Sequence, residues 1–453
     1  MPPDPASMIS DPPASGGPSM LRALRHRNFK LFFFGQLLSL PGTWIQMVAQ
    51  SWLIYRLTDS AVLLGLAGFA SQFPVFLIAP LGGALADRFS RHRLLIGTQL
   101  ASAVLALALA ALTLSGQVEV WHVFTLASLL GVVNGFDLPA RQAFTVQLVG
   151  RDDLPNAIAL NSSAFNAARL VGPAVAGVLV AAAGEGWCFL LNGVSYATVL
   201  AALLAMRLTP TEKPIHTGSV LAHIVDGVRY VRGHLPIRSL LLLLGMVSLA
   251  GMPYAVLMPV FADRILHGGP QGLGILMSCA GGGALVGALL LAARRSPRGL
   301  GAWVPWAAFG FGLGLVGFSL SRSFWLSGAL LVPTGFAMMV QMAASNTLLQ
   351  MMVPDALRGR VMSLYSMMFM GMAPLGSLLA GSLAGVIGAP GTVAGGGALC
   401  MLAALWFRRR LPQIRGAIRG AGSGEPAADG RGAQPVDGAR RPEPQSGAPE
   451  RLD

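Results

Sequence analysis

Long apolar runs limit what this chain can fold into more than any other feature of its sequence. A helix that spans the hydrocarbon core of a bilayer needs about 20 predominantly apolar residues, and such runs recur along the 453 residues with only short breaks. They are too long for barrel strands and lack alternating polar residues, which excludes a β-barrel. The sequence predicts an all-α membrane protein with twelve transmembrane helices, at residues 30–55, 61–85, 93–114, 120–141, 156–183, 187–206, 238–263, 271–292, 302–320, 324–350, 359–387 and 391–407.

The basic residues are placed unevenly around these spans. The chain is 54% hydrophobic and 11% charged, with a formal net charge of +13. With a cytoplasmic N-terminus, 22 of the 32 Lys and Arg residues fall on the cytoplasmic side and six more in the C-terminal tail. Only Arg56, Arg264 and Arg322 fall on the opposite side, and Arg169 lies within a span. This asymmetry follows the positive-inside rule, so we expect both termini in the cytoplasm and no nucleic-acid partner.

The parts of the chain outside the spans predict little folded structure. Residues 1–27 lack the basic and apolar regions of a cleaved signal, and residues 408–453 are rich in Gly, Pro, Ala and Arg. Both ends are therefore expected to be disordered. The cytoplasmic linker at 208–236 contains a short amphipathic helix, which lies along the membrane surface or is solvated. The three cysteines lack metal-type spacing and imply no disulfide framework. We expect no metal site, and we also expect no cofactor.

The linker separates six spans from six, and the two halves resemble each other weakly. A shift of 209 residues places Gly42 on Gly251 and Gly65 on Gly274. The fifth expected span, with "LVGPAVAGVLVAAAG", echoes the eleventh, with "GMAPLGSLLAGSLAGVIG". Repeated halves with a binding site at their interface are a known architecture of secondary transporters. We therefore expect two pseudo-symmetric six-helix lobes, at 28–207 and 237–407.

Polar residues follow one face of the first expected span. They are spaced three, four, three and four residues apart, which stacks them on one side of a helix. Polar groups are tolerated in a membrane where they line an aqueous passage or form hydrogen bonds between helices. Both alternatives remain open for this stripe, which consists of Gln36, Ser39, Thr43, Gln46 and Gln50.

Two further features belong to other spans. In the tenth expected span, Thr334, Met338, Gln341 and Ser345 fall on one helical face, with Asn346 beside it. Hydrogen bonding between helices is again the alternative to lining a cavity. Arg169 is an intramembrane charge and thus a candidate functional residue. It either attracts an anionic substrate or pairs with helix carbonyls or Asp137.

A cytoplasmic loop carries a recognisable motif. The stretch "GGALADRFSRHRLL", from Gly82 to Leu95, resembles the signature loop of the major facilitator superfamily, G-x-L-a-D-R-x-G-R-[RK], with Ser90 in place of the usual glycine. The resemblance implies a conformational latch, in which the aspartate is held by an arginine, by an acid at the cytoplasmic end of the fourth span, and by the helix that starts near "DALRGR". The alternative for that acid, Asp137, is a pair with Arg141. The latch residues are Gly83, Asp87, Arg88, Arg91, Asp137 and Arg141.

The fifth expected span carries a second motif. The stretch "ARLVGPAVAG", from Ala168 to Gly177, resembles the antiporter motif of exporters in the superfamily through Gly172, Pro173 and Gly177. Small residues also let helices pack closely, so packing alone is the other interpretation. The segments "NFKLFFFGQLLSLPG" and "DLPARQAF" resemble the branch that includes the enterobactin exporter and macrolide efflux proteins.

The resemblance implies a function and a site. It implies a bacterial inner-membrane exporter of a small amphiphilic molecule, such as a siderophore or drug, which works by alternating access as a proton antiporter. We expect a monomer whose partners are the substrate, protons and the lipid bilayer. In this fold the first, fourth, seventh and tenth spans line the cavity. The cavity candidates are Gln36, Ser39, Thr43, Gln46, Gln50, Asn134, Arg169, Gln341, Ser345 and Asn346.

Other classes of function fit the sequence less well. An importer is the alternative within transport, and a passive channel has no positive sign in the sequence. A primary pump would need a G-x-x-x-x-G-K-[ST] loop, and an enzyme would need a motif such as H-E-x-x-H or G-x-S-x-G. None of these motifs is present. The sequence thus favours a transporter that is not an enzyme.

Overall fold

The computed structural model describes residues 21–150, 152–208, 220–294 and 299–423. Within these ranges the secondary structure is entirely helical, without strands. The predicted all-α class is therefore confirmed. Eleven helical segments are long and apolar enough to cross a membrane, and the last of them, Leu357–Gln413, is 57 residues long. A crossing needs about 20 residues, so the length of this last segment is enough for two crossings.

The first half of the chain forms six long helices. A short 3₁₀ turn, η2, precedes them, and α4 continues beyond its expected end at residue 141, which places Asp137 and Arg141 well inside the helix. The bounds are η2 Arg22–Arg25, α1 Arg27–Thr58, α2 Ala61–Arg88, α3 Arg91–Leu114, α4 Val120–Val149, α5 Leu154–Ala183 and α6 Glu185–Leu204.

The second half is less regular. The expected span at 238–263 is divided into short α, 3₁₀ and π segments, because Pro253 and Pro259 cannot donate the backbone hydrogen bonds of a continuous α-helix. The elements are α7 Val220–Gly233, α8 Leu235–Met246, η3 Val247–Gly251, η4 Met252–Ala255, α9 Met258–Val260, η5 Phe261–Ile265, α10 Gly269–Ala293, α11 Leu300–Leu320, α12 Phe324–Met352, α13 Asp355–Ser366, η6 Met367–Gly371 and α14 Met372–Ser423.

A bend divides α14 into two apolar segments. Gly388 has φ 78° and ψ 160°, a conformation that only glycine adopts without strain. The bend falls between the eleventh and twelfth expected spans, whose predicted bounds are 359–387 and 391–407. The count of eleven apolar segments thus becomes twelve when α14 is divided at Gly388.

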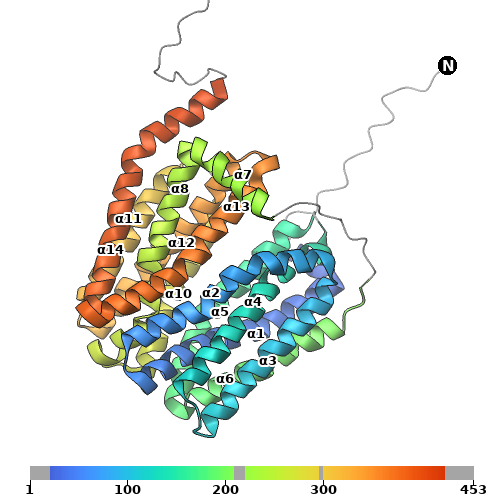
Figure 1. Ribbon diagram of the computed structural model, residues 1–453, viewed down its shortest axis with the longest axis vertical. Helices are drawn as coiled ribbons and strands as arrows, with labels where there is room; N and C mark the ends of the chain where they lie inside the picture. The colour runs from blue at the N-terminus through green and yellow to red at the C-terminus, as the bar shows by residue number, and fades with distance from the viewer. Residues whose placement is uncertain (1–20, 151, 209–219, 295–298, 424–453) are drawn as a thin grey trace, which may run out of the picture.

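The helices gather in two groups. Figure 1 shows α1, α3, α4 and α6 in the lower right, and α8, α11, α12 and α14 in the upper left. Two seams join the groups, one between α2 and α14 and the other between α5 and α10. A Cβ at Gly65 would lie 2.5 Å from the Ser377 carbonyl, and one at Gly274 would lie 2.4 Å from the Pro173 carbonyl. Gly65 and Gly274 are the positions that the 209-residue shift superposes.

The segments outside the spans differ from expectation at both ends. Ala23, in η2, is fully buried, and its backbone N–H donates to Asn156 Oδ1 at 2.8 Å. At the other end, α14 remains helical to Ser423. The expectation of disorder was therefore wrong for residues 21–26 and 408–423. The remaining parts of both expected tails lie outside the described residues.

The linker helix α7 packs against the second half of the chain. Its Asp226 carboxylate lies 3.1 Å from the Arg360 guanidinium of α13, and Val231 is 8% exposed. The contact with α13 differs from a fully solvated helix, which was one of the two alternatives. The other alternative, a position along the membrane surface, stays a prediction. The helix therefore ties the linker to the region where α12 ends and α13 begins.

Candidate functional site

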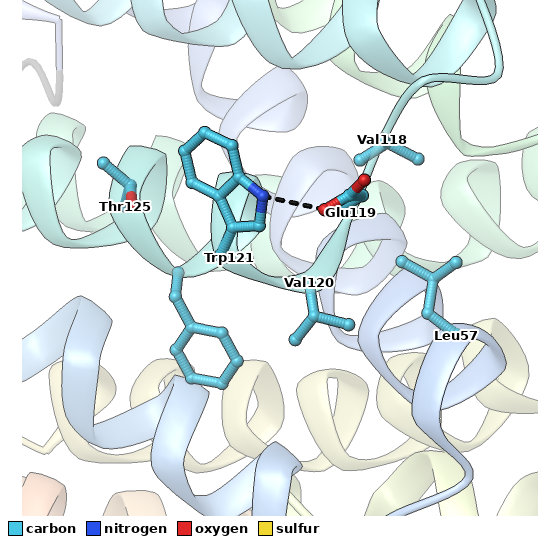
Figure 2. Close-up of a pocket in the computed structure, with 7 residues that line it drawn as sticks. Leu57, Val118, Glu119, Val120, Trp121 and Thr125 are labelled. Atoms are coloured by element: carbon cyan, nitrogen blue, oxygen red, sulfur yellow. Dashed lines mark hydrogen bonds between the residues drawn. The ribbon is translucent and has the colours of Figure 1, made fainter.

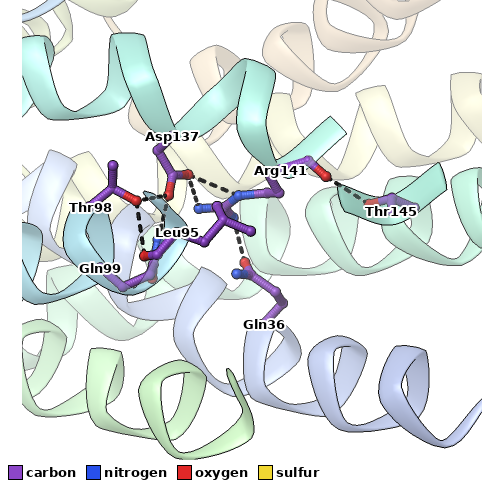
Figure 3. Close-up of polar contacts among 7 residues, drawn as sticks. All are labelled: Gln36, Leu95, Thr98, Gln99, Asp137, Arg141 and Thr145. Atoms are coloured by element: carbon purple, nitrogen blue, oxygen red, sulfur yellow. Dashed lines mark hydrogen bonds and ion pairs between the residues drawn. The ribbon is translucent and has the colours of Figure 1, made fainter. Parts of the chain in front are cut away.

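A hydrogen-bonded network joins α1, α3 and α4 inside the first helical group (Figure 3). Asp137 is 4% exposed. One of its carboxylate oxygens accepts from Thr98 Oγ1 at 2.7 Å and from Gln99 Nε2 at 2.8 Å. Its other oxygen accepts from Arg141 Nε at 2.9 Å and also from Arg141 Nη2. Arg141 in turn donates to Gln36 Oε1, and we call these five residues the polar cluster.

In the polar cluster, Asp137 pairs with Arg141 and not with Arg169, the other partner that the sequence suggested for it. Because Asp137 and Arg141 are four residues apart on α4, their side chains lie on one helical face. Both carboxylate oxygens are occupied by donors from α3 and α4. The charge is therefore neutralised within the first helical group, which makes the cluster a structural element in this conformation.

The remaining latch residues lie at the junction of α2 and α3. Arg91 donates to the backbone carbonyls of Ala86 at 3.3 Å and Ala143 at 3.4 Å. Ser90 is extended and accepts from the Arg93 backbone as the N-cap of α3, which explains why serine replaces the glycine of the motif. Gly83 lies within the last turns of α2, and the exposed Arg88 is its final residue. The side chain of Asp87 lies outside the described part of the structure.

Three residues of the α1 stripe form hydrogen bonds to neighbouring helices. Gln36 accepts from Arg141, Ser39 lies 3.1 Å from Ser195 Oγ, and Gln46 accepts from Asn192 Nδ2 at 2.6 Å. All three are buried. These contacts correspond to the alternative of inter-helix bonding. Thr43 is exposed and Gln50 is half-buried, and a position along an aqueous passage stays a prediction for these two residues.

The polar face of α12 is less completely bonded. Gln341 is fully buried. Its Nε2 lies 3.5 Å from Ser345 Oγ, and its Oε1 has no hydrogen-bond partner among the described residues. Asn346 is half-buried and accepts from Gln350. A buried carbonyl oxygen without a donor costs free energy, so a ligand or water that donates to Gln341 would stabilise this site.

Arg169 lies between the two helical groups. It is the sixteenth residue of the 30-residue α5, and an added Cβ at Gly281 of α10 would lie 2.7 Å from its carbonyl oxygen. Its guanidinium is 5.9 Å from the ring centroid of Trp44 on α1 and 4.0 Å from Met338 Sδ on α12. No carboxylate of the described residues forms an ion pair with it.

The exporter-like segment of α5 packs against both groups. A Cβ at Gly172 would lie 2.5 Å from Trp44 Cβ, and one at Gly177 would lie 2.8 Å from the Pro270 carbonyl. The segment thus positions Trp44 and Arg169 on one side and holds α10 on the other. Asn134, the remaining cavity candidate, is exposed on α4.

The sequence analysis did not predict the contacts between the C-terminal end of α1 and η5. Tyr55 Oη donates to Asp263 Oδ2 at 3.2 Å, and Arg264 pairs with Asp59. These contacts join the first helical group to the second. Opposite charges at the ends of two spans were visible in the sequence, but nothing in it paired spans from different lobes.

A surface pocket lies beside the same end of α1. Figure 2 shows Trp121 and Glu119 at its wall, with the indole N–H donating to Glu119 Oε2 at 2.8 Å. The other lining residues are Leu57, Val118, Val120, Phe124 and Thr125. None of them belongs to the α1 stripe or the α12 face, so this pocket is separate from the Arg169 region.

The arrangement of long apolar helices in two groups is that of a polytopic membrane protein. Residues 18–421 match the family described as transmembrane secretion effectors, and the chain belongs to this family of the major facilitator superfamily. The resemblance found in the sequence is thereby confirmed. The related proteins are transporters and not enzymes.

Two relatives and one solved structure illustrate the similarity. The chain is 27% identical to the staphyloferrin A transporter of Staphylococcus aureus, over 85% of this chain and 97% of the relative. It is 28% identical to the multidrug efflux pump Tap of Mycolicibacterium fortuitum, over 79% and 89% of the two chains. It also superposes on a bacterial homologue of the lysosomal transporter Spinster, solved in an inward-facing conformation, with a TM-score of 0.67, 14% identity and coverage of 88% and 99%.

Proposed function

We propose that this chain exports a small amphiphilic molecule with an acidic group and that Arg169 binds the acidic group. An arginine within a membrane protein is costly unless an anion, water or carbonyl groups compensate it. The described contacts of Arg169 are an indole face and a thioether, and neither is an anion. The single observation that carries the proposal is this uncompensated charge between the two helical groups.

The surroundings of Arg169 fit an amphiphile. Trp44 and Met338 offer apolar contact beside the guanidinium, and thioethers adapt to ligands of different shape. Gln341 lies one turn beyond Met338 on α12 and has a free acceptor oxygen. A substrate with an anionic group, an apolar body and a hydrogen-bond donor would satisfy all of these groups. The siderophore and drug transport named for the relatives agrees with such a substrate.

We propose that the structure corresponds to the conformation open to the cytoplasm. Tyr55 and Asp263, together with Asp59 and Arg264, join the two groups at one end. Across both seams, glycine contacts at Gly65, Gly177 and Gly274 lie in the helix halves next to those pairs. The positive-inside rule assigns that end to the outside. Both termini would then be cytoplasmic, in the inner membrane of a bacterium.

The signature loop would stabilise the opposite conformation. In this proposal, Asp87, Arg91 and the helix that begins at α13 come together when the cytoplasmic side closes. Asp137 would contribute to that closed state through Arg141. A charge-assisted contact is worth about 1–3 kcal/mol, enough to shift a two-state balance roughly five- to 150-fold. Asp87→Asn should therefore leave the protein abundant but slow its transport.

The direction of transport can be tested with a matched pair of probes. Inside-out vesicles with and without the protein would receive a fluorescent amphiphile that bears a carboxylate, or its neutral amide. We expect accumulation of the acid in the vesicle lumen, lost when an uncoupler removes the proton gradient. Accumulation only in right-side-out vesicles would contradict export, and persistence with the uncoupler would contradict proton antiport.

A further inference from the structure

The backbone of Arg169 rests on α10, a helix of the second helical group. In a regular α-helix the Arg169 carbonyl would accept from the backbone N–H four residues further on. That residue is Pro173, which has no N–H. The carbonyl oxygen lies against Gly281 of α10, where an added Cβ would be 2.7 Å away from it. The proline therefore frees a polar group of α5, and the glycine makes room for it.

A hydrogen bond joins the following residue of α5 to the same helix. Ser278 Oγ of α10 donates to the Leu170 carbonyl at 2.8 Å. Ser278 and Gly281 are three residues apart, so they lie on one face of α10. We call Ser278 and Gly281 the α10 seat, because they contact the carbonyl groups of Leu170 and Arg169.

The same stretch of α10 also contacts α12. An added Cβ at Gly335 of α12 would collide with the Ala280 carbonyl, and one at Gly283 would collide with the Val332 carbonyl. Small residues allow this close approach of two helix backbones. Because α10 packs against both α5 and α12 (Figure 1), residues 278–283 fix these two helices relative to each other.

Both of these helices carry residues of the proposed substrate site. Arg169 belongs to α5, whereas Met338 and Gln341 belong to α12. The guanidinium lies 5.9 Å from an indole ring and 4.0 Å from a thioether, and both distances are longer than a hydrogen bond between nitrogen and oxygen. The short, directional contact beside Arg169 is the one that Ser278 makes with the backbone. The α10 seat therefore decides how far Arg169 lies from the free acceptor of Gln341.

The α10 seat lies near the middle of both helices. Ser278 is the tenth of 25 residues in α10, and Leu170 is the seventeenth of 30 residues in α5. The contacts that join α1 to η5 lie at helix ends instead. When two packed helices rock against each other, their middles move less than their ends. The seat is thus placed to hold Arg169 in both conformations of a transport cycle.

We infer, on the basis of the proposed role of Arg169, that Ser278 and Gly281 are positioning residues that set which acidic substrates fit. A substrate whose anionic group contacts Arg169 and whose donor reaches Gln341 must match the separation between α5 and α12. Because the α10 seat fixes that separation, it selects substrates by the distance between their acidic group and their donor.

The first test measures transport by the full-length protein in inside-out vesicles. Ser278→Ala removes the donor to Leu170 and should raise KM for the carboxylate probe roughly two- to twelvefold, the range of a neutral hydrogen bond. The maximal rate and KM for the neutral amide should stay close to their natural values. Ser278→Thr keeps the hydroxyl and should keep the natural KM. Ser319→Ala is the matched control, because this buried hydroxyl donates to Val316 of its own helix, and it should change neither KM.

The second test compares carboxylates that carry a hydroxyl at increasing distance from the acid. Gly281→Ala places a methyl group against the Arg169 carbonyl, which should push α5 away from α10. The preferred carboxylate should then be a longer one. Gly282→Ala is the matched control, since its Cβ would meet only the end of the Leu170 side chain, at 3.4 Å. This variant should keep the natural preference.

The possible outcomes distinguish the role of the α10 seat from that of Arg169. If the natural protein transports the acid and the amide equally, or if Arg169→Gln slows both equally, the role of Arg169 fails and that of the seat fails with it. If the natural protein prefers the acid, but Ser278→Ala keeps its KM and Gly281→Ala keeps its length preference, only the role of the seat is overturned. An equal rise of KM for acid and amide in Ser278→Ala would overturn it too, because the hydrogen bond would then serve the fold alone.

Discussion

Two arginines on helices of the first half of the chain have opposite surroundings. Arg141 shares the carboxylate of Asp137 and donates to Gln36, within a network that also binds Thr98 and Gln99. Arg169 has an indole and a thioether beside it and no carboxylate among the described residues. The polar cluster is complete without a ligand, whereas the Arg169 region is incomplete. Charge inside a membrane protein therefore marks a scaffold in one place and a candidate binding site in the other.

The largest effect is expected from breaking the complete network. Asp137→Ala leaves Arg141 without its carboxylate, and removal of one partner of a buried pair costs about 3–5 kcal/mol. The free energy of unfolding, measured in detergent or lipid, should fall by that amount. Asp137→Ala/Arg141→Leu should recover part of the loss, because the unpaired charge is gone. Natural stability in Asp137→Ala would show that the polar cluster does not support the fold.

The second-largest effect is expected on transport, from a change of Arg169. Arg169→Gln should leave stability unchanged or raise it, because an uncompensated charge is removed. Transport of the carboxylate probe should fall roughly ten- to 150-fold, which corresponds to the about 1.5–3 kcal/mol of a hydrogen bond to a charged group. Transport of the neutral amide should change little. An equal fall for both probes would assign Arg169 to the fold and not to substrate binding.

A third prediction separates the stripe of α1 from the Arg169 region. Gln46→Leu leaves the Asn192 amide without its acceptor, which costs about 1–3 kcal/mol of stability. Affinity for the carboxylate probe should remain, because the Gln46 carbonyl is already occupied. Gln50→Leu, at a half-buried position of the same helix, is the matched control and should affect stability less. Lower affinity with natural stability would return Gln46 to the binding site.

The smallest effect is expected at a third charged group, outside the membrane. The hydrogen bond from His26 and the nearby charges of Arg22 and Arg25 lower the pKa of Asp153. Because the folded-state pKa is lowered, the stabilisation is complete above the unfolded pKa of about 3.9 and is lost as pH falls through the folded pKa.

Hydrogen exchange can test this attachment of η2. At neutral pH, Asp153→Asn should speed amide exchange of Ala23, whose N–H is bonded to Asn156. Asp152→Asn, a change of the exposed neighbour, should not. Exchange that is equally fast in both variants would mean that Asp153 does not hold the turn.

The sequence by itself determined the membrane class, the twelve apolar segments and the family. These depend on local composition, since about 20 apolar residues cross a bilayer whatever their partners are. Local composition also identified the break between the last two apolar segments, where Gly388 lies, and the small residues of "ARLVGPAVAG". The weak repeat between the halves aligned Gly65 with Gly274, and each of these glycines lies at a close contact between helices.

Only the tertiary structure decided which polar residues are already bonded. The five residues of the α1 stripe look alike in sequence, but three of them contact donors or hydroxyls more than 100 positions away. Asp137 had two expected partners of the right charge. Arg141 is its neighbour on α4 itself, and the packing of α3 added Thr98 and Gln99 as donors. Hydrogen bonds act over about 3 Å, while sequence patterns identify only a helical face. The difference between Arg141 and Arg169 therefore arises from how the helices pack around them.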